Sequence, residues 1–321
     1  MKILANDGIS PAGEAAVKKY GFEISTDFIA QDELVDTINK EGYSALLVRS
    51  ATKVRKDIID NCPGLKLIGR GGVGMDNIDV EYARSKGIHV VNTPASSSLS
   101  VAEMVMAQAF AFSRFLHKSY ADMPNKGATE FKALKKAYAK GTELRGKTMG
   151  IIGMGRIGQA LASYALGCGM DVIFYDRSRE NTAIELEIVH HGTIEVNLTK
   201  SDLDTVLSKS DYLSLHVPAQ PDGKAILGAA EFAKMKDSAI LINTARGNSI
   251  DADALVSALD NNTLKGAIMD VFENEPTPNP ELLKHAKIAT TPHIGAATLE
   301  AQERIGLELA DLLNEKLTVN A

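Results

Sequence analysis

Short apolar segments alternate with helix-forming segments along the whole chain. In its first part, Val, Ile and Leu are concentrated in segments at residues 2–5, 22–25, 45–49, 65–69 and 89–92. Segments that are apolar on both faces are typical of parallel strands buried between two layers of helices. The pattern therefore predicts an α/β fold built on a doubly wound parallel sheet.

A long apolar stretch interrupts this alternation at residues 98–118, where we expect a helix that bridges two domains. Further strands are predicted at residues 148–153, 171–176, 212–217, 239–245, 266–272 and 287–292. A second long amphipathic helix is expected from Thr298 to about Lys316. If it mirrors the first, the chain crosses between the domains twice. We therefore predict two doubly wound parallel-sheet domains, one of residues 1–97 plus 294–321 and one of residues 98–293.

The net charge and the cysteine content exclude several classes of function. A formal charge of −6 over 321 residues argues against a nucleic-acid-binding protein, which needs a basic face. The two cysteines, Cys62 and Cys168, show no metal-ligand spacing, so we predict no metal site and a reducing compartment. No apolar run approaches the ~18 residues that span a bilayer, and the N-terminus lacks a signal-peptide pattern. We expect a cytoplasmic protein without membrane contact.

A glycine-rich turn follows the predicted strand at residues 148–153. Gly153, Gly155 and Gly158 form a GxGxxG motif that opens a helix, and backbone N–H groups in this arrangement bind a pyrophosphate. The next strand ends at Asp176, near the customary spacing of ~20 residues, where a carboxylate binds ribose hydroxyls and repels a 2′-phosphate. The sequence thus predicts a dinucleotide cofactor and favours NAD over NADP, although Arg177 lies beside Asp176.

Three polar motifs, NTARG, DVFENEP and TPHIG, follow later strands of the same predicted domain. Ligands bind at this edge of open α/β sheets. Oxidation of an alcohol needs a base for the hydroxyl proton, and imidazole titrates near neutral pH, so His293 is the candidate base. Glu275 is the carboxylate that would orient His293, and Arg246 would bind a substrate carboxylate. His216, which ends another strand, is expected near the nicotinamide.

The motifs GMGRIG, DVIFYD, LSLHVP, INTARG, DVFENEP and TPHIG resemble, in order and spacing, those of the D-isomer-specific 2-hydroxyacid dehydrogenase family. The resemblance covers essentially the whole chain. It implies the same three catalytic roles, a Rossmann-type NAD domain at residues 98–293 and a flavodoxin-like substrate domain at residues 1–97 plus 294–321. It also implies further cofactor contacts from Arg156, Ile157, His216, Val217, Pro218, Thr244, Ala245, Asp270, Gly295 and Ala296.

Within the family, the chain is most similar to the phosphoglycerate dehydrogenases, in the segments VRSATKV, GRGGVGMDNID, NTP, SVAE and GTELRGKT. This similarity implies oxidation of 3-phospho-D-glycerate to 3-phosphohydroxypyruvate, the first step of L-serine biosynthesis. A phosphorylated substrate needs extra positive charge, which Arg49, Arg70 or the pair Lys135 and Lys136 could supply. Substrate contacts are implied for Arg49, Ser50, Arg70, Gly71, Gly72 and Val73.

Two features depart from the phosphoglycerate dehydrogenases. The turn Ala95–Ser98 replaces an Asn-rich turn of many of these enzymes, which loosens the substrate assignment. The sequence also lacks their C-terminal regulatory domain, so we expect no feedback inhibition through such a domain.

The sequence leaves alternatives open. One is the same chemistry on another acid, in a glyoxylate/hydroxypyruvate reductase or a D-lactate-type dehydrogenase. A more distant one is an NAD-sensing co-repressor that retains the same residues without turnover. The apolar face of residues 99–116 suggests self-association. We expect a homodimer or homotetramer that binds a small anionic substrate.

Overall fold

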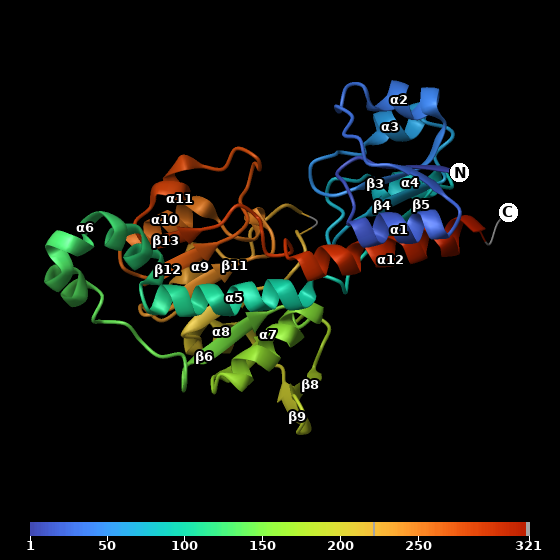
Figure 1. The fold of residues 1–321 in the computed structure, drawn as a ribbon. Coiled ribbons are helices and arrows are strands. Elements are labelled where there is room, and N and C mark those ends of the chain that lie inside the picture. Colours follow the sequence, from blue (N-terminus) through green and yellow to red (C-terminus); the bar gives the residue numbers. More distant parts are fainter. Residues whose placement is uncertain (221, 319–321) are drawn as a thin grey trace. The chain divides into compact units, whose positions relative to one another are not determined.

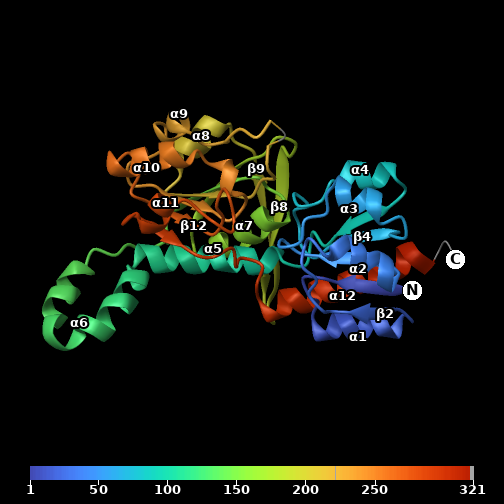
Figure 2. The same cartoon turned by 90° about the horizontal axis from the view of Figure 1, so that it is seen from above.

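The computed structural model describes residues 1–220 and 222–318, which form two compact units. Unit 1 comprises Met1–Ser100 and the segment from Ala296 onward, and unit 2 comprises Val101–Gly295. These boundaries lie within three residues of the predicted ones. Figures 1 and 2 show the ribbon in two views.

Unit 1 contains one parallel five-stranded sheet whose strand order is β2-β1-β3-β4-β5. This is the flavodoxin-type order 2-1-3-4-5. Its strands are β1 (Lys2–Ala5), β2 (Glu23–Ser25), β3 (Tyr43–Val48), β4 (Leu67–Arg70) and β5 (His89–Asn92). Its helices are α1 (Pro11–Lys19), α2 (Leu34–Glu41), α3 (Lys56–Asn61), α4 (Val80–Ser85) and α12 (Leu299–Thr318).

Alternate residues of these strands pack against helices on opposite faces of the sheet. Leu46 packs among α2, α3 and α4, whereas its neighbours Ala45 and Leu47 pack against α1 and α12. Figure 1 shows α1 and α12 side by side on that second face. The C-terminal helix therefore completes a core built from the first hundred residues, which makes the unit discontinuous in sequence.

Unit 2 contains a parallel six-stranded sheet with the order β13-β12-β11-β10-β6-β7. Its strands are β6 (Thr148–Ile152), β7 (Asp171–Tyr175), β10 (Tyr212–Leu215), β11 (Ile240–Asn243), β12 (Gly266–Met269) and β13 (Ile288–Thr290). The chain adds β7 on one side of β6 and all later strands on the other. The topological switch point, where ligands bind in such sheets, therefore lies between β6 and β10.

Helices cover both faces of the unit 2 sheet. One face packs on α7 (Arg156–Gly167) and on α5, which begins at Ser98 and ends at Ser113. The other face packs on α8 (Leu203–Lys209), α9 (Ala229–Phe232), α10 (Ala252–Asp260) and α11 (Pro280–Lys284). The predicted fold class, two doubly wound parallel-sheet domains, is thus confirmed.

Two local predictions need correction. The helix expected at residues 98–118 breaks after Ser113, because Phe115 adopts a left-handed conformation (φ 55°), and α6 (Leu116–Ala137) leaves at an angle of 56°. An antiparallel hairpin, β8 (Asn181–Ile188) and β9 (Gly192–Thr199), occupies a segment for which no strand was predicted. Ile184 on the apolar face of the hairpin is buried against the core beneath α7.

In the described part of the chain, no single helix is both long and apolar enough to cross a membrane. The bent pair α5 and α6 passes the same test of length and composition when the two are taken together. Core helices of globular domains also pass it, and α5 is such a helix, since Ala102, Val105 and Ala109 are fully buried in unit 2.

Candidate active site

The GxGxxG motif forms the turn between β6 and α7. Gly153 has a φ of 98°, and a Cβ on it would lie 2.4 Å from the carbonyl oxygen of His216. A Cβ on Gly158 would lie 2.2 Å from the carbonyl oxygen of Gly153, so both positions exclude a side chain. A Cβ on Gly155, in contrast, would meet no atom within 4 Å. Gly155 therefore borders open space, and the N–H groups of the first turn of α7 have no partners within the helix. This turn fits a pyrophosphate.

Asp176 follows β7 and faces this turn. Its Oδ2 accepts a hydrogen bond from the Met154 N–H (2.8 Å), and its Oδ1 accepts from the N–H groups of Ser178 (2.9 Å) and Arg179 (3.1 Å). Burial alone would raise the pKa of Asp176, but the N–H donors of Ser178, Met154 and Arg179 outweigh it and hold the pKa below its usual range. The carboxylate is therefore charged at neutral pH, which suits a free 2′-hydroxyl and disfavours a 2′-phosphate.

We expect Asp176→Ala to weaken the discrimination between NAD and NADP. The substitution removes a charge that repels the 2′-phosphate and leaves Arg177 and Arg179 beside it. The ratio of kcat/KM for NADP to that for NAD should rise on the order of tenfold or more. Asp171→Ala, at the opposite end of β7, is the control and should leave the ratio unchanged. An unaltered ratio in Asp176→Ala would show that specificity resides elsewhere.

Two buried polar atoms lie in the loops that follow β10 and β11, at the same edge of the sheet. His216 Nε2 lies 2.9 Å from Ser214 Oγ, whereas its Nδ1 has no hydrogen-bond partner among the described residues. Burial lowers the pKa of His216 to about 3, so the ring is neutral. Thr244 Oγ1 is also buried and unpartnered within residues 1–220 and 222–318. Val217, Pro218 and Ala245 belong to the same two loops. These orphaned groups fit a bound ligand at this edge.

Glu275 and His293, predicted to act together, are brought together in unit 2. His293 Nδ1 lies 2.7 Å from Glu275 Oε2, and Glu275 Oε1 accepts a hydrogen bond from the Phe272 N–H (2.9 Å). The imidazole is 42% exposed, so its other nitrogen remains accessible. An ionised carboxylate only accepts hydrogen bonds, so the contact with Glu275 requires a proton on His293 Nδ1. In the neutral imidazole Nε2 then carries no proton and can accept one. The pair has the chemistry of a positioned general base.

Arg246 lies in the loop between β11 and the 3₁₀ turn Gly247–Ser249. Its Nη1 donates to the carbonyl oxygen of Ala245 (2.7 Å). Asn243 holds the loop, since its Nδ2 donates to the Arg246 carbonyl oxygen (2.8 Å) and its Oδ1 accepts from the Ala245 N–H (3.0 Å). This loop and the Phe272–Glu275 loop follow neighbouring strands, β11 and β12.

Asp270, predicted to contact the nicotinamide, has a different set of partners in the structure. Its carboxylate is buried and accepts from the N–H groups of Ile294 and Gly295 (both 2.9 Å) and from Thr291 Oγ1 (2.7 Å). It therefore holds the segment that carries His293. Of the remaining predicted cofactor residues, Arg156 and Ile157 open α7, and Ala296 lies at the start of the returning segment of unit 1.

The predicted substrate residues belong to unit 1. Arg49 and Ser50 follow β3, where Arg49 lines a pocket of about 530 Å³ together with residues 7–12, Leu299, Gln302 and Glu303. No side-chain partner for the Arg49 guanidinium occurs among the described residues. Arg70 ends β4, and Gly71, Gly72 and Val73 follow it. Gly72 has a φ of 142°, which L side chains rarely adopt, and the Arg70 guanidinium occupies the place that a Cβ on it would take.

The sequence motifs gave no role to two residues that hold the Arg49 loop. Asp7 Oδ2 accepts hydrogen bonds from the N–H groups of Arg49 (2.6 Å) and Thr52 (3.1 Å). Asn77 Nδ2 donates to the carbonyl oxygens of the same two residues, at 2.8 and 2.7 Å. Asn77 stands within the GMDNID segment, so its position was available as a signal. Asp7 stands in an ordinary turn, and the sequence contains no sign of its role.

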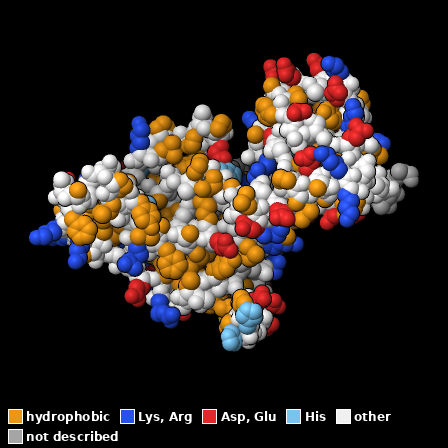
Figure 3. All heavy atoms as spheres, in the orientation of Figure 1, with side chains coloured by type: hydrophobic (Ala, Val, Ile, Leu, Met, Phe, Trp, Pro, Cys, Tyr) orange, Lys and Arg blue, Asp and Glu red, His pale blue; other side chains and the backbone are white. Residues whose placement is uncertain are grey.

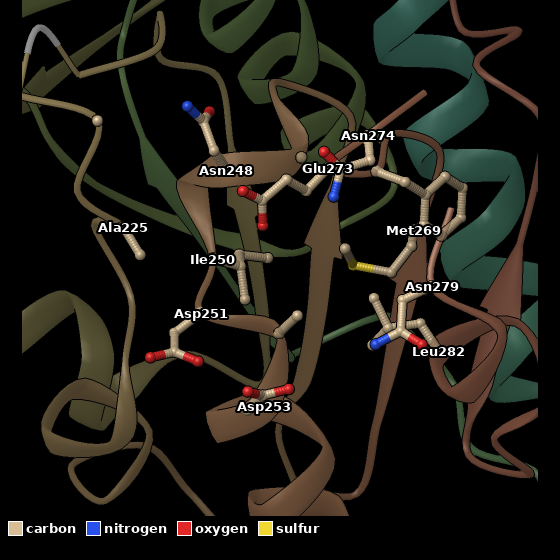
Figure 4. A pocket seen from close by; sticks show the side chains of 14 residues that line it. Ala225, Asn248, Ile250, Asp251, Asp253, Met269, Glu273, Asn274, Asn279 and Leu282 are labelled. Atoms are coloured by element: carbon tan, nitrogen blue, oxygen red, sulfur yellow. The ribbon is translucent and has the colours of Figure 1, made fainter. Parts of the chain in front are cut away.

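A second pocket, of about 290 Å³, lies in unit 2 on the outer side of the two catalytic loops (Figure 4). Its wall includes Asn248, which follows the Arg246 loop, and Glu273, which precedes Glu275. Figure 4 shows the carboxylates of Asp251, Asp253 and Glu273 around an apolar floor that includes Ile250 and Met269. The described residues that line this pocket include these three carboxylates and no Lys or Arg, so it does not fit an anionic hydroxy acid.

Comparison with known proteins agrees with this geometry. Residues 106–295 match the model of the D-isomer specific 2-hydroxyacid dehydrogenase NAD-binding domain. A hydroxypyruvate reductase of Thermotoga maritima is 40% identical, with 99% of both chains covered. A D-3-phosphoglycerate dehydrogenase of Methanocaldococcus jannaschii is 38% identical over 99% of this chain, which spans 57% of that protein's length. The crystal structure of the TT0316 protein from Thermus thermophilus superposes with a TM-score of 0.84 at 30% identity, covering 99% of this chain and 97% of that one.

The chain therefore belongs to the D-isomer-specific 2-hydroxyacid dehydrogenase family and is an NAD-dependent 2-hydroxyacid dehydrogenase. The predicted family and the predicted cofactor are both confirmed. Relatives that act on different acids match at nearly the same identity, so the family alone leaves the substrate open.

Proposed function

We propose that the chain oxidises 3-phospho-D-glycerate at C2 to 3-phosphohydroxypyruvate, the first step of L-serine biosynthesis. Bound NAD supplies the acceptor for the hydride that leaves C2. His293 takes the hydroxyl proton on Nε2, because its Nδ1–H is committed to Glu275. Arg246 binds the substrate carboxylate and polarises the carbonyl that forms at C2. The hydroxyl proton goes to the imidazole as the hydride leaves the same carbon, so charge and atoms balance.

The observation that carries the choice of a phosphorylated substrate is the Arg49 guanidinium, which has no side-chain partner among residues 1–220 and 222–318. A phosphate adds charge that Arg246 alone does not neutralise, and an arginine without a carboxylate partner is suited to bind it. Asp7 and Asn77 fix the backbone around Arg49, so the guanidinium is presented from a rigid loop. Preorganisation of this kind lowers the entropy cost of binding. Ser50 and the Gly71–Val73 loop supply further polar contacts in this proposal.

The test compares matched substrates with and without the phosphate. We expect kcat/KM for NADH formation at alkaline pH to be at least about 100-fold higher with 3-phospho-D-glycerate than with D-glycerate. Arg49→Gln should remove most of that preference while leaving the rate with D-glycerate nearly unchanged. Lys53→Gln, an exposed cation in the same segment, is the control and should have no effect. A rate indifferent to the phosphate would contradict the proposal.

Hydroxypyruvate reduction is a second candidate, favoured by the Thermotoga relative that matches over the full length of both chains. The two candidates share every catalytic step and differ only in the phosphate. Measuring NADH oxidation with hydroxypyruvate, 3-phosphohydroxypyruvate and glyoxylate distinguishes them. A preference for hydroxypyruvate, unaltered by Arg49→Gln, would assign the chain to the reductases, and turnover of none of these acids would favour the co-repressor alternative.

We also propose that the chain forms a homodimer or homotetramer through α5 and α6. Figure 3 shows apolar side chains gathered over this part of unit 2, and Phe110, Tyr120 and Phe131 are between 42% and 71% exposed. An apolar surface of this kind on a globular unit marks an interaction site. Tyr120→Glu combined with Phe131→Glu should reduce the mass measured by light scattering to that of one chain. Phe28→Glu, equally apolar and exposed but in unit 1, should not.

A further inference from the structure

A glutamine on α5 contacts the segment that carries His293. Gln108 Nε2 lies 3.0 Å from Thr291 Oγ1, although the two residues are 183 positions apart in sequence. Its Oε1 is buried and has no partner among residues 1–220 and 222–318. The only hydrogen bond recorded for this side chain in the described part of the chain is thus directed at a residue two positions before His293.

The direction of this hydrogen bond is fixed by the next one. Thr291 Oγ1 lies 2.7 Å from Asp270 Oδ1, and an ionised carboxylate only accepts hydrogen bonds. The hydroxyl proton of Thr291 is therefore committed to Asp270. Gln108 must present its NH₂ group, and the three side chains form a relay of donors from α5 to Asp270. Such chains strengthen each of their members by polarisation.

Asp270 links the hydrogen bonds of Gln108 and Thr291 to the backbone after His293. The carboxylate is 1% exposed and accepts from the N–H groups of Ile294 and Gly295, both at 2.9 Å. His293 has a φ of 55°, a left-handed conformation that a non-glycine residue keeps only where its surroundings enforce it. The relay holds the chain before His293 through Thr291 and after it through two amides.

We propose that Gln108 is a positioning residue for the proposed base. It does not contact substrate. Through Thr291 and Asp270 it keeps the segment Thr291–Gly295 in the conformation that places His293 Nδ1 within 2.7 Å of Glu275 Oε2. This inference rests on the proposed role of His293 in proton transfer. Gln108 lies outside all of the sequence motifs, so none of them indicates this role for α5.

The test removes the relay one member at a time. Gln108→Met deletes the hydrogen bond to Thr291, and Thr291→Val deletes that bond together with the one to Asp270, each at nearly constant volume. We expect Gln108→Met to lower kcat about 3- to 10-fold, the effect of one net hydrogen bond, and Thr291→Val to lower it at least as much, with KM and NADH affinity within about twofold of wild type. Thr291→Ser keeps the hydroxyl and should restore kcat. Gln108→Glu keeps the shape but presents a carboxylate that cannot donate, so it should fail like Gln108→Met and serves if that variant is unstable.

The double variant separates a relay from two independent packing defects. If Gln108 acts only through Thr291, Gln108→Met should add nothing to Thr291→Val, whereas independent effects would multiply. Gln31→Met, the same change in unit 1 at a side chain that hydrogen-bonds the backbone of Lys53, should be silent. Multiplicative losses, or an unchanged kcat in both single variants together with unchanged amide exchange, would overturn the proposal.

Amide hydrogen exchange tests the relay by a measurement that does not depend on turnover. Protection of the Ile294 and Gly295 amides should fall in Gln108→Met and Thr291→Val, while that of the Met269 amide within the sheet stays constant. Unchanged protection at Ile294 and Gly295 would refute the relay. Lost protection with full turnover would show that the relay orders this segment without positioning the base, and it would overturn the role proposed for Gln108. The role of His293 itself fails only if His293→Asn keeps its turnover, so the two proposals fail in distinguishable ways.

Discussion

His293→Asn should lower kcat by about 100- to 10,000-fold, the usual contribution of a positioned general base. Asparagine is the informative replacement because His293 has a φ of 55°, and asparagine tolerates the left-handed region better than most residues. The backbone between Thr291 and Gly295 should therefore keep its hydrogen bonds to Asp270. Steady-state turnover in both directions measures the loss.

Three comparisons test whether the loss is one of proton transfer. NADH affinity, measured by fluorescence, should stay near the wild-type value in His293→Asn, because the glycine turn and Asp176 are untouched. His191→Asn, at the exposed turn of the β8–β9 hairpin, carries the same chemical change and should be silent. Glu275→Gln should lie between the two, since the imidazole keeps a hydrogen-bonding partner but loses the carboxylate that stabilises its charged form. A turnover unchanged in His293→Asn would remove it from the mechanism.

The sequence predicted the two sheets well because buried parallel strands are apolar on both faces. The strand expected at residues 171–176, for example, is β7 at Asp171–Tyr175. Predicted strands in the second series were too long at their ends: residues 239–245 were expected and Ile240–Asn243 observed. The difference has a physical reason. Thr244 and Ala245 leave the sheet, which places Arg246 in a loop at its edge.

Two features that the sequence analysis did not predict, the β8–β9 hairpin and the break between α5 and α6, have weaker or different sequence signals. In the β8–β9 hairpin the apolar positions Ile184, Leu186 and Ile188 alternate with exposed Glu185 and Glu187, the pattern of a half-exposed antiparallel strand. This strand is apolar on one face only, so a pattern of segments apolar on both faces does not predict it. The break between α5 and α6 has no glycine or proline at Phe115 to mark it, so composition could not have located it.

Some contacts of the candidate site could be predicted from the sequence and others could not. Glu275 and His293 could be paired from sequence because motifs after adjacent strands meet at one edge of a parallel sheet. The contact between Gln108 and Thr291 could not, since it depends on how α5 lies across the sheet. For Asp270 the family resemblance implied a cofactor contact, and the structure adds that its carboxylate accepts hydrogen bonds from the segment that carries His293. Helix packing, which has no local signature, decides such contacts.

Gly247→Ala should lower kcat/KM by about 100-fold or more, although Gly247 contributes no functional group. A Cβ at this position would lie 1.9 Å from the Phe272 carbonyl carbon and 2.2 Å from the Glu273 nitrogen, and neither backbone atom can move alone. The loop after Arg246 and the loop before Glu275 must therefore separate. A displacement of about 1 Å in catalytic groups is enough for a loss of this size.

The same overlap predicts a measurable loss of stability. Overpacking of this kind costs about 1–3 kcal/mol, so Tm should fall by several degrees while the fold persists. Gly228→Ala is the matched control in the same unit, because a Cβ there would meet its nearest atom at an ordinary 3.6 Å. It should leave both Tm and turnover unchanged. If Gly247→Ala lowered Tm but kept its kcat/KM, the spacing of these two loops would not limit catalysis, and Arg246 and Glu275 would be acting independently. Loss of activity with an unchanged Tm would instead mean that the loops separate without strain and that catalysis alone depends on their contact.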